Sequence, residues 1–303
     1  MLNLYNLLQL QLVIMKSQLL VLFVLTGLYT HTCSGQEQQI PNPLVRVLEN
    51  AYDQDQQIRD TLNRYGEKFG PVSMEYKKVL KRMMVVDSSL QQQVFPILDK
   101  YGYPSKKQSS DKASKGVFMV LQHAELNAQL KYAPLLDQAF LSGEVDKWSY
   151  AFYKDRINMR QGKFQAYGSQ VLGDNLGNLY VHPILDEPNV DKRRKKLGMG
   201  PLKDHLAANG VQNYVLPKRD TLKGKVVVIG HFWDAAQKPV AGITVWLKDK
   251  QVGTATAKGF FEVAVQKYPQ EKLILSFVRA GYQTITYPLT GDKDVYQIYM
   301  QLK

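Results

Sequence analysis

Cysteine is almost absent from this chain of 303 residues, whose single cysteine is Cys33. One cysteine cannot form an internal disulfide, and it offers no paired spacing for a zinc or thiol-redox site. If the first 35 residues are removed as a leader, the remaining chain also has no thiol nucleophile. The sequence therefore excludes cysteine-based catalysis and cysteine-based metal sites beyond residue 35.

Acidic side chains are absent from the first 35 residues, which carry a single charge, Lys16. Their apolar run extends only from Ser17 to Tyr29, which is too short to span a bilayer but suits the hydrophobic part of a secretory signal. The chain begins at Met1 or, with residues 1–14 as an over-extended gene start, at Met15. We predict a signal peptide over residues 1–35, no transmembrane helix in the mature chain, and an exported protein in the periplasm or associated with the outer membrane.

The surroundings of Cys33 favour loss of this residue with the signal peptide. Cleavage after Gly35 places small residues, Cys33 and Gly35, at the −3 and −1 positions. A lipoprotein signal would have a small residue before the cysteine and leucine near −3, whereas Thr30 and Thr32 stand there. We therefore do not expect lipidation at Cys33.

Negative charge is scarce in the whole chain, whose formal net charge is +12. Removal of residues 1–35 takes away one lysine and no acid, so the mature chain keeps a charge of +11. In an exported protein this charge favours an anionic envelope component as partner, such as a glycan, a peptide or a lipid headgroup. Nucleic acid is not expected as a partner, because no nucleic-acid-binding motif is present.

The signatures of common cofactor and metal sites are also missing. His123, His182 and His205 are scattered, and none has a second histidine at metal-binding spacing. The chain has no glycine-rich phosphate loop and no G-x-S-x-G nucleophile motif. We predict neither a metal nor a cofactor.

Apolar residues at helical spacing predict a helical first half. One helix is expected over residues 44–70, and a second begins at Asp87 or Ser88, bends at Pro96 and ends at residues 101–104. Further helical patterns cover residues 113–132, 134–143 and 144–162. A linker of residues 36–43 precedes this array.

The pattern changes at Lys163. Residues 163–171 and 179–184 are typical of two short strands, and the glycine- and asparagine-rich residues 173–178 predict the turn between them. A short helix opening at Asn189 or Asp191 and ending at Gly198 follows, and then another over residues 201–210. Residues 211–222 are expected to be a linker.

From residue 223 onward the hydrophobic period becomes two, with six or seven short apolar runs separated by turn residues. This pattern predicts a small β-sandwich over residues 223–303. The predicted fold class is thus α+β and multi-domain. A mainly helical domain with a small β-hairpin, residues 44–210, is followed by a seven-stranded β-sandwich.

Residues 223–290 resemble the carboxypeptidase regulatory-like domain, a transthyretin-like fold common in envelope proteins of the Bacteroidetes type. The resemblance lies in "GKVVV", "KPVAGITVWLKDKQVGTATAKGFFEV" and "LSFVRAGYQT". Ala257 departs from the aspartate that usually occupies the turn. The resemblance implies an accessory module in a cell-envelope setting and no protease machinery.

Residues 44–210 resemble an uncharacterised bacterial family, DUF6624. Six pieces occur in order: Asp55-Gln56 with Arg59, "ILDKYGYPS", residues 122–125 ("QHAE"), Asp155-Arg156, residues 165–170 ("QAYGSQ") and "VDKRRKKLGMGPL". The departures are Glu125 for aspartate, Tyr103 for tryptophan and Ser169 for threonine. The resemblance implies that these pieces converge, and it implies no reaction.

The stretch "FQAYGSQV" contains two glutamines on either side of a glycine. A bulge at Gly168 would reverse the strand alternation and turn Gln165, Tyr167 and Gln170 toward one side. They would then line a polar pocket. The alternative is that the glutamines lie on the exposed face of a two-stranded ribbon.

His123 is the candidate catalytic residue, because an imidazole titrates near neutral pH. It is expected within a helix, beside an apolar face, with Asp155 as the carboxylate that orients it. The alternative is a structural histidine. Asp155 and Arg156 are adjacent and cannot both face one pocket, so an ion pair elsewhere is the alternative for one of them.

Four more residues complete the expected pocket. Asp191 suits the first turn of its helix, and Arg193 and Arg194 suit bidentate binding of phosphate or carboxylate. Arg59 joins them through the family resemblance. The alternative for the run "KRRKK" is a solvated basic face.

These residues leave three hypotheses open. The first is a binding protein whose arginines and glutamines hold an anionic or polar ligand. The second is a hydrolase or transferase with His123 as general base. The third is a structural envelope scaffold, which requires that the motifs be dispersed over the surface.

Overall fold

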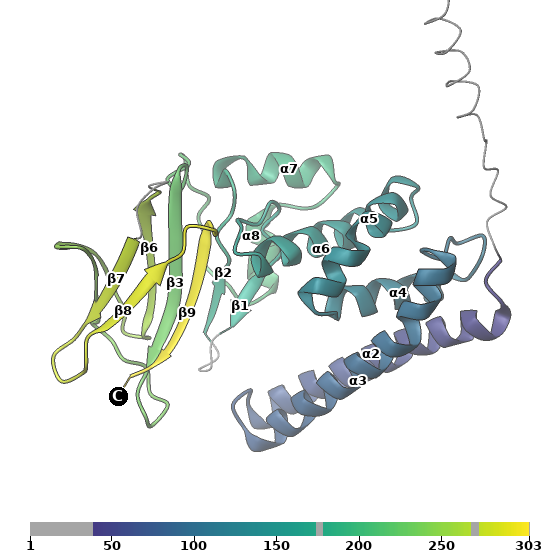
Figure 1. Cartoon of the computed structure of the whole chain (residues 1–303), viewed down its shortest axis with the longest axis horizontal. Helices are drawn as coiled ribbons and strands as arrows, with labels where there is room; N and C mark the ends of the chain where they lie inside the picture. Colours follow the sequence, from purple (N-terminus) through teal and green to yellow (C-terminus); the bar gives the residue numbers. More distant parts are fainter. Residues whose placement is uncertain (1–38, 174–177, 268–272, 303) are drawn as a thin grey trace, which may run out of the picture. The chain divides into compact units, whose positions relative to one another are not determined.

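The computed structural model describes residues 39–173, 178–267 and 273–302 (Figure 1). The predicted signal peptide, Cys33 and most of the turn at residues 173–178 lie outside this part. The helices and strands belong to one compact unit, Ile40–Lys303. No helix in the described ranges has the length and apolar character needed to cross a membrane.

A series of helices followed by β-sheets makes up the fold, in agreement with the predicted order. The described part opens with the helices α2 (Asn42–Phe69), α3 (Met74–Tyr101), α4 (Asp111–His123), α5 (Leu126–Leu141) and α6 (Lys147–Arg160). The side chains of Ser73, Ser110 and Asp146 each accept a hydrogen bond from the backbone N–H three residues later, which fixes the starts of α3, α4 and α6.

The start of α3 corrects the predicted helix at Asp87 or Ser88. The helix begins at Met74, because Ser73 accepts the N–H of Tyr76 and caps it there. Asp87 therefore lies inside a continuous helix. Pro96 also lies inside α3, which continues to Tyr101 before Gly102 ends it with a positive φ of 76°.

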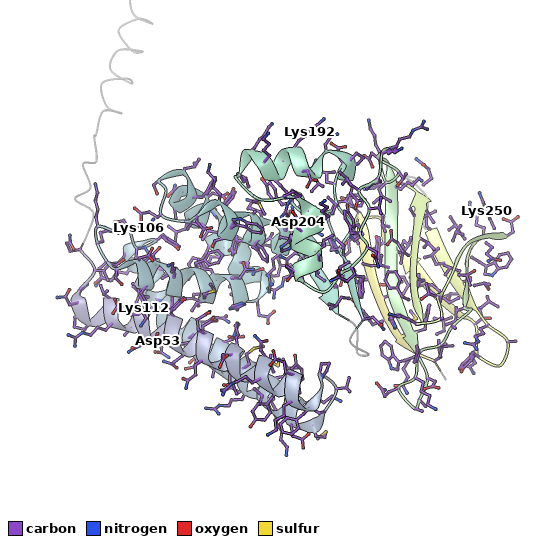
Figure 2. All side chains as sticks on the ribbon, turned by 180° about the vertical axis from the view of Figure 1, so that it is seen from behind. Asp53, Lys106, Lys112, Lys192, Asp204 and Lys250 are labelled. Atoms are coloured by element: carbon purple, nitrogen blue, oxygen red, sulfur yellow. The ribbon has the colours of Figure 1, made fainter. Side chains whose placement is uncertain are left out.

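The helical core is built mainly where α4 crosses the first half of α2. Its buried residues include Leu48 on α2, Leu90 and Val94 on α3, and Val117 and Leu121 on α4. Gly116 allows the close contact, because a Cβ at this position would lie 2.1 Å from the backbone oxygen of Leu48. The ion pair between Lys112 and Asp53, 2.7 Å long, joins the same two helices at the surface (Figure 2).

The short helices follow in the predicted order, but the predicted strand over residues 163–171 is wrong, because only residue 171 of that range belongs to a strand and Gln165 forms an isolated bridge. Strands β1 (Val171–Gly173) and β2 (Leu179–Val181) pair antiparallel. Then come a 3₁₀ turn, η1 (Glu187–Asn189), and helices α7 (Val190–Lys196) and α8 (Leu202–Ala208). Helix α7 begins after Asn189, as predicted, and the chain turns at Gly198 with a φ of 66°.

Seven strands lie among the described residues of the C-terminal part. They are β3 (Lys225–Trp233), β4 (Thr244–Leu247), β5 (Lys250–Thr254), β6 (Phe260–Gln266), β7 (Leu273–Val278), β8 (Ile285–Leu289) and β9 (Val295–Gln301). One sheet has the order β6-β3-β9, with β3 and β9 parallel, and the other has the order β5-β4-β7-β8. Buried residues of both sheets, such as Val228, Phe261 and Leu275, belong to a single hydrophobic cluster.

The close contact at Gly116 generates the first prediction. Gly116→Ala is expected to lower the free energy of unfolding by about 1–3 kcal/mol, because the new methyl group meets backbone that cannot move aside cheaply. Gly66→Ala is the matched control, since Gly66 is also helical and its Cβ would meet only the Tyr76 side chain at 3.3 Å. This control should be neutral or more stable by about 0.5–1 kcal/mol. Equal urea midpoints for the two variants would contradict the described packing.

Candidate functional site

Five polar side chains gather between four helices. Asp55 and Arg59 lie four residues apart on α2 and therefore share a face. Asp87 comes from α3, His123 is the last residue of α4, and Arg156 comes from α6. We call Asp55, Arg59, Asp87, His123 and Arg156 the Arg59 cluster.

The position of His123 at the end of α4 corrects the predicted mid-helix position. The chain turns into an extended conformation at Ala124, with φ −68° and ψ 161°, and α5 starts two residues later. His123 thus projects from a helix end. Among the described residues its hydrogen-bonding partners are Asp55 and Arg59, whereas the predicted partner, Asp155, bonds elsewhere.

Hydrogen bonds fix the tautomer of His123. Its Nδ1 lies 2.8 Å from Oδ1 of Asp55, and its Nε2 lies 3.2 Å from Nε of Arg59. A guanidinium N–H can only donate, so Nε2 is the acceptor and the proton of a neutral imidazole sits on Nδ1, facing Asp55. Asp55 and His123 thus form a carboxylate–imidazole pair, and Nε of Arg59 donates to the lone pair on Nε2 of the imidazole.

Arg59 also joins the two carboxylates of the cluster. Its Nη2 donates to both carboxylate oxygens of Asp87, at 3.0 and 3.2 Å, and lies 3.5 Å from Oδ1 of Asp55. The side chain of Asp55 is 1% exposed, and the side chains of Arg59, Asp87 and His123 are between 16% and 19% exposed. The cluster is therefore mostly desolvated but open to solvent on one side.

Burial and nearby positive charge act on His123 in the same direction. Burial lowers the pKa of His123, the charges of Arg59 and Arg156 lower it further, and Asp55 opposes them. The net shift is downward, which favours the neutral imidazole.

Arg156 differs from the other basic residues of the cluster. Among the described residues it makes no hydrogen bond and no ion pair, and its Nε is buried. Burial, followed by the charges of Arg160 and Arg59, lowers the pKa of Arg156 to about 10. Nη1 of Arg59 is also buried without a partner. Two guanidinium groups of one cluster thus have N–H groups without acceptors.

The cluster also contains three groups that ligate metals in other proteins. Asp55, Asp87 and His123 each offer one ligand atom, and these atoms lie within 4.8 Å of one another. Arg59 contacts all three side chains, so the guanidinium is the cation that these side chains surround. A divalent ion at this place would have to displace Arg59.

Most of the other predicted site residues lie in a second constellation, formed around residues 165–170. Asp155 accepts hydrogen bonds from the backbone N–H groups of Ala166 (2.6 Å), Tyr167 (3.1 Å) and Ser169 (3.0 Å), and from the Ser169 hydroxyl (2.9 Å). Burial raises the pKa of Asp155, and these hydrogen bonds oppose the shift. Both carboxylate oxygens are used in holding the loop.

Gln165 and Gln170 face each other across Gly168, but they do so inside the loop. The side-chain oxygen of Gln165 accepts the N–H of Gln170 at 2.8 Å, and its amide nitrogen donates to the carbonyls of Gln170 and His182. Both glutamines are buried. Gly168 has a φ of 68°, and a Cβ there would lie 2.6 Å from the Leu202 side chain. The glycine therefore serves a tight, buried turn in place of the predicted strand bulge.

The charged residues of α7 brace the same loop. Nε of Arg193 donates to the carbonyl of Ala166 at 2.8 Å, and its terminal nitrogens donate to the carbonyls of Leu185 and Asp186. The side chain of Asp191 accepts the N–H of Leu202 at 2.7 Å, which fixes the start of α8.

Arg194 is fully buried in the same brace. It donates to the carbonyls of Tyr167 and Gly200, each at 2.7 Å, and its guanidinium lies 5.2 Å from the ring centre of Trp148. Only its Nη2 has no partner among the described residues. The expected single pocket is thus divided. Arg59, His123 and Arg156 lie in the Arg59 cluster, whereas the remaining predicted residues hold the loop.

Two residues of the Arg59 cluster were not among the predicted site residues. Asp55 is signalled by its spacing to Arg59, because residues four apart on a helix are neighbours. Asp87 had been interpreted as a helix cap, and its inward position follows only once α3 is known to begin at Met74.

Comparison with known proteins supports a family but no activity. Residues 43–213 match the model of a family described as "Family of unknown function (DUF6624)". A comparison with curated proteins found no match. Among solved structures, a 9R-lipoxygenase from Cyanothece PCC8801 is 14% identical with a TM-score of 0.19, over 34% of this chain and 20% of that chain. The chain spans about a fifth of that enzyme's length, and the likeness supports no inference about fold or activity.

The bonds of Asp155 generate the second prediction. Asp155→Asn replaces a carboxylate oxygen, which accepts hydrogen bonds, with an NH₂ group, which donates them. This group would face backbone N–H groups that also donate, so the free energy of unfolding should fall by about 3 kcal/mol or more. The matched control is Asp137→Asn, whose carboxylate is 42% exposed and pairs with Lys154. This control should cost less than about 1 kcal/mol. Similar unfolding midpoints for the two variants would show that the loop does not depend on Asp155.

Proposed function

We propose that this chain, which belongs to the DUF6624 family of unknown function, binds a small anionic ligand at the Arg59 cluster. The observation that carries the proposal is the guanidinium of Arg156, whose Nε is buried and which has no acceptor among the described residues. Buried charges in proteins are paired, since an uncompensated one costs several kcal/mol. A carboxylate or phosphate group of a ligand is the partner that would complete the cluster.

The charge balance of the cluster supports an anion over a neutral ligand. Arg59, Arg156 and the adjacent Arg160 contribute three positive charges, and Asp55 and Asp87 contribute two negative charges. His123 is favoured in its neutral form. The cluster therefore carries one excess positive charge where little water reaches it. The unpartnered N–H groups of Arg59 and Arg156 are donors suited to carboxylate or phosphate oxygens.

A second candidate function is hydrolysis or group transfer with His123 as general base. The bond between Asp55 and Nδ1 of His123 favours this candidate, because it orients the imidazole and leaves Nε2 as the basic atom. In this proposal Asp55 replaces Asp155 as the orienting carboxylate. An anion that draws the N–H groups of Arg59 toward itself would release Nε2 for proton transfer.

The C-terminal strands fit an accessory role in this proposal. Their two sheets share one hydrophobic cluster, which supports a seven-stranded sandwich of the carboxypeptidase regulatory-like kind. We propose that this module mediates envelope interactions in an exported protein, with the ligand site confined to the helical part.

Thermal unfolding with inorganic phosphate or acetate as the probe tests the anion site. A ligand at one hundred times its dissociation constant stabilises the folded state by about 2.7 kcal/mol, which raises the Tm by several degrees in a protein of this size. Arg156→Gln should abolish the rise and leave the ligand-free protein as stable as the parent or more stable, because it removes an unpaired buried charge.

Arg64→Gln is the matched control, since Arg64 is 66% exposed and forms an ion pair with Asp60, which is also exposed. It should keep the full response to anions. If neither anion raises the Tm, or if Arg156→Gln responds as the parent does, the proposed site is wrong.

Hydrolysis of p-nitrophenyl phosphate and p-nitrophenyl acetate tests the second candidate. Cleavage that falls at least about a hundredfold in both His123→Gln and Asp55→Asn is the expected result, since general-base catalysis typically contributes that much. Unchanged rates in both variants would contradict a role of the pair in catalysis.

A further inference from the structure

The turn between α2 and α3 lies at the end of a long helical hairpin, where both helices stop together (Figure 1). We infer that this hairpin tip, residues 65–78, is a docking surface for an anionic lipid membrane. The inference rests on side chains outside the Arg59 cluster and goes beyond the proposed ligand site.

Large apolar side chains are concentrated at the hairpin tip. Tyr65 is 38% exposed, Phe69 42%, Val72 55% and Met74 64%. The rings of Tyr65 and Phe69 lie against each other, with centroids 5.4 Å apart. Val72 lies in the turn, and Met74 is the first residue of α3. Single exposed apolar residues are ordinary on a protein surface, whereas a contiguous group marks an interaction site.

The helical core does not reach this end of the hairpin. On α2 the members of the main core cluster end at Ala51, and on α3 they begin at Val86, so none of its residues lies between positions 52 and 85. Ile58 and Leu62 are buried nearer the tip on α2 but do not belong to that cluster, so the apolar side chains of the tip lie far along the chain from the main helical core. They are exposed because both helices extend well beyond the main helical core.

Charge identifies the partner. From Arg64 to Arg82 the chain carries six basic side chains and two acidic ones, so the surroundings of the tip are strongly cationic. Lys68, Lys77 and Lys78 are exposed, and Nζ of Lys68 lies 5.1 Å from the centre of the Phe69 ring. Apolar side chains at the end of a hairpin with lysines around them suit a lipid surface, because the apolar groups enter the acyl boundary while the lysines contact anionic headgroups.

Vesicle flotation tests the inference directly. The protein is the chain without residues 1–35, since the apolar run of residues 17–29 would itself bind lipid and the compact unit Ile40–Lys303 is retained. It should float with phosphatidylcholine vesicles that contain about one third phosphatidylglycerol and stay in solution with pure phosphatidylcholine. Raised salt should weaken the binding. Equal behaviour with both vesicle types, bound or unbound, would overturn the inference.

Variants of the apolar side chains locate the contact. Phe69→Ser with Met74→Ser should weaken binding to the anionic vesicles at least tenfold. The matched control is Leu141→Ser with Val215→Ser, which removes two apolar side chains that are 83% and 82% exposed elsewhere. All four positions are solvent-exposed, so the substitutions are not expected to unfold the protein. The Tm of each variant checks that it remains folded. Equal loss in both double variants would contradict a defined tip.

Charge variants separate a local surface from the general positive charge of the chain. Lys77→Gln with Lys78→Gln should weaken binding about 25-fold, since each basic residue near an anionic surface contributes roughly fivefold. Lys195→Gln with Lys196→Gln removes the same charge from exposed positions on α7 and should change binding little. If the α7 pair has the larger effect, the basic face of α7 is the docking surface and the inference is wrong.

Discussion

Each N–H group of a buried guanidinium needs a hydrogen-bond acceptor. The contacts of the buried polar side chains in the helical part follow from this requirement. Arg193 and Arg194 meet it mainly with backbone carbonyls, and in doing so they hold residues 165–170 against α7. Arg59 meets it in part, with Asp87 and with His123, and thereby connects α2, α3 and α4, while its Nη1 has no partner among the described residues. Arg156 has no acceptor within the described chain, and its Nε is buried. The proposed anion site rests on the unpartnered N–H groups of these two residues.

The two constellations are linked through α6. Asp155 and Arg156 are adjacent on this helix, and the helical rotation between neighbours turns them in different directions. Asp155 faces the loop and accepts its N–H groups, while the charge of Arg156 acts on His123. Asp155 thus ties the loop to α6, the helix that also carries Arg156.

Much of the fold follows from local patterns, whereas the partners of buried polar groups do not. Residues 44–70 carry a helical apolar spacing and form α2 almost to the predicted ends. The predicted start of α3 at Asp87 or Ser88 is wrong because Ser73 caps the helix at Met74, which places Asp87 inside the helix and directs it inward. Gln165 and Gln170 were predicted to face one pocket, yet the side chain of Gln165 bonds to backbone groups of residues 170 and 182. The amide nitrogen of Gln170 donates to the carbonyl of Phe152 and to the hydroxyl of Ser169. Such partners come from distant segments, and side-chain spacing carries no information about them.

The central claim is that Arg59 and Arg156 together hold an anion. Crystals of the chain soaked in tungstate, which replaces phosphate and scatters anomalously, test it most directly. The account predicts an anomalous peak within hydrogen-bonding distance of Nη1 of Arg59 and Nε of Arg156, the two buried nitrogens of the Arg59 cluster that have no partner among the described residues. A site occupied by water alone, with tungstate bound only to exposed lysines, would contradict it.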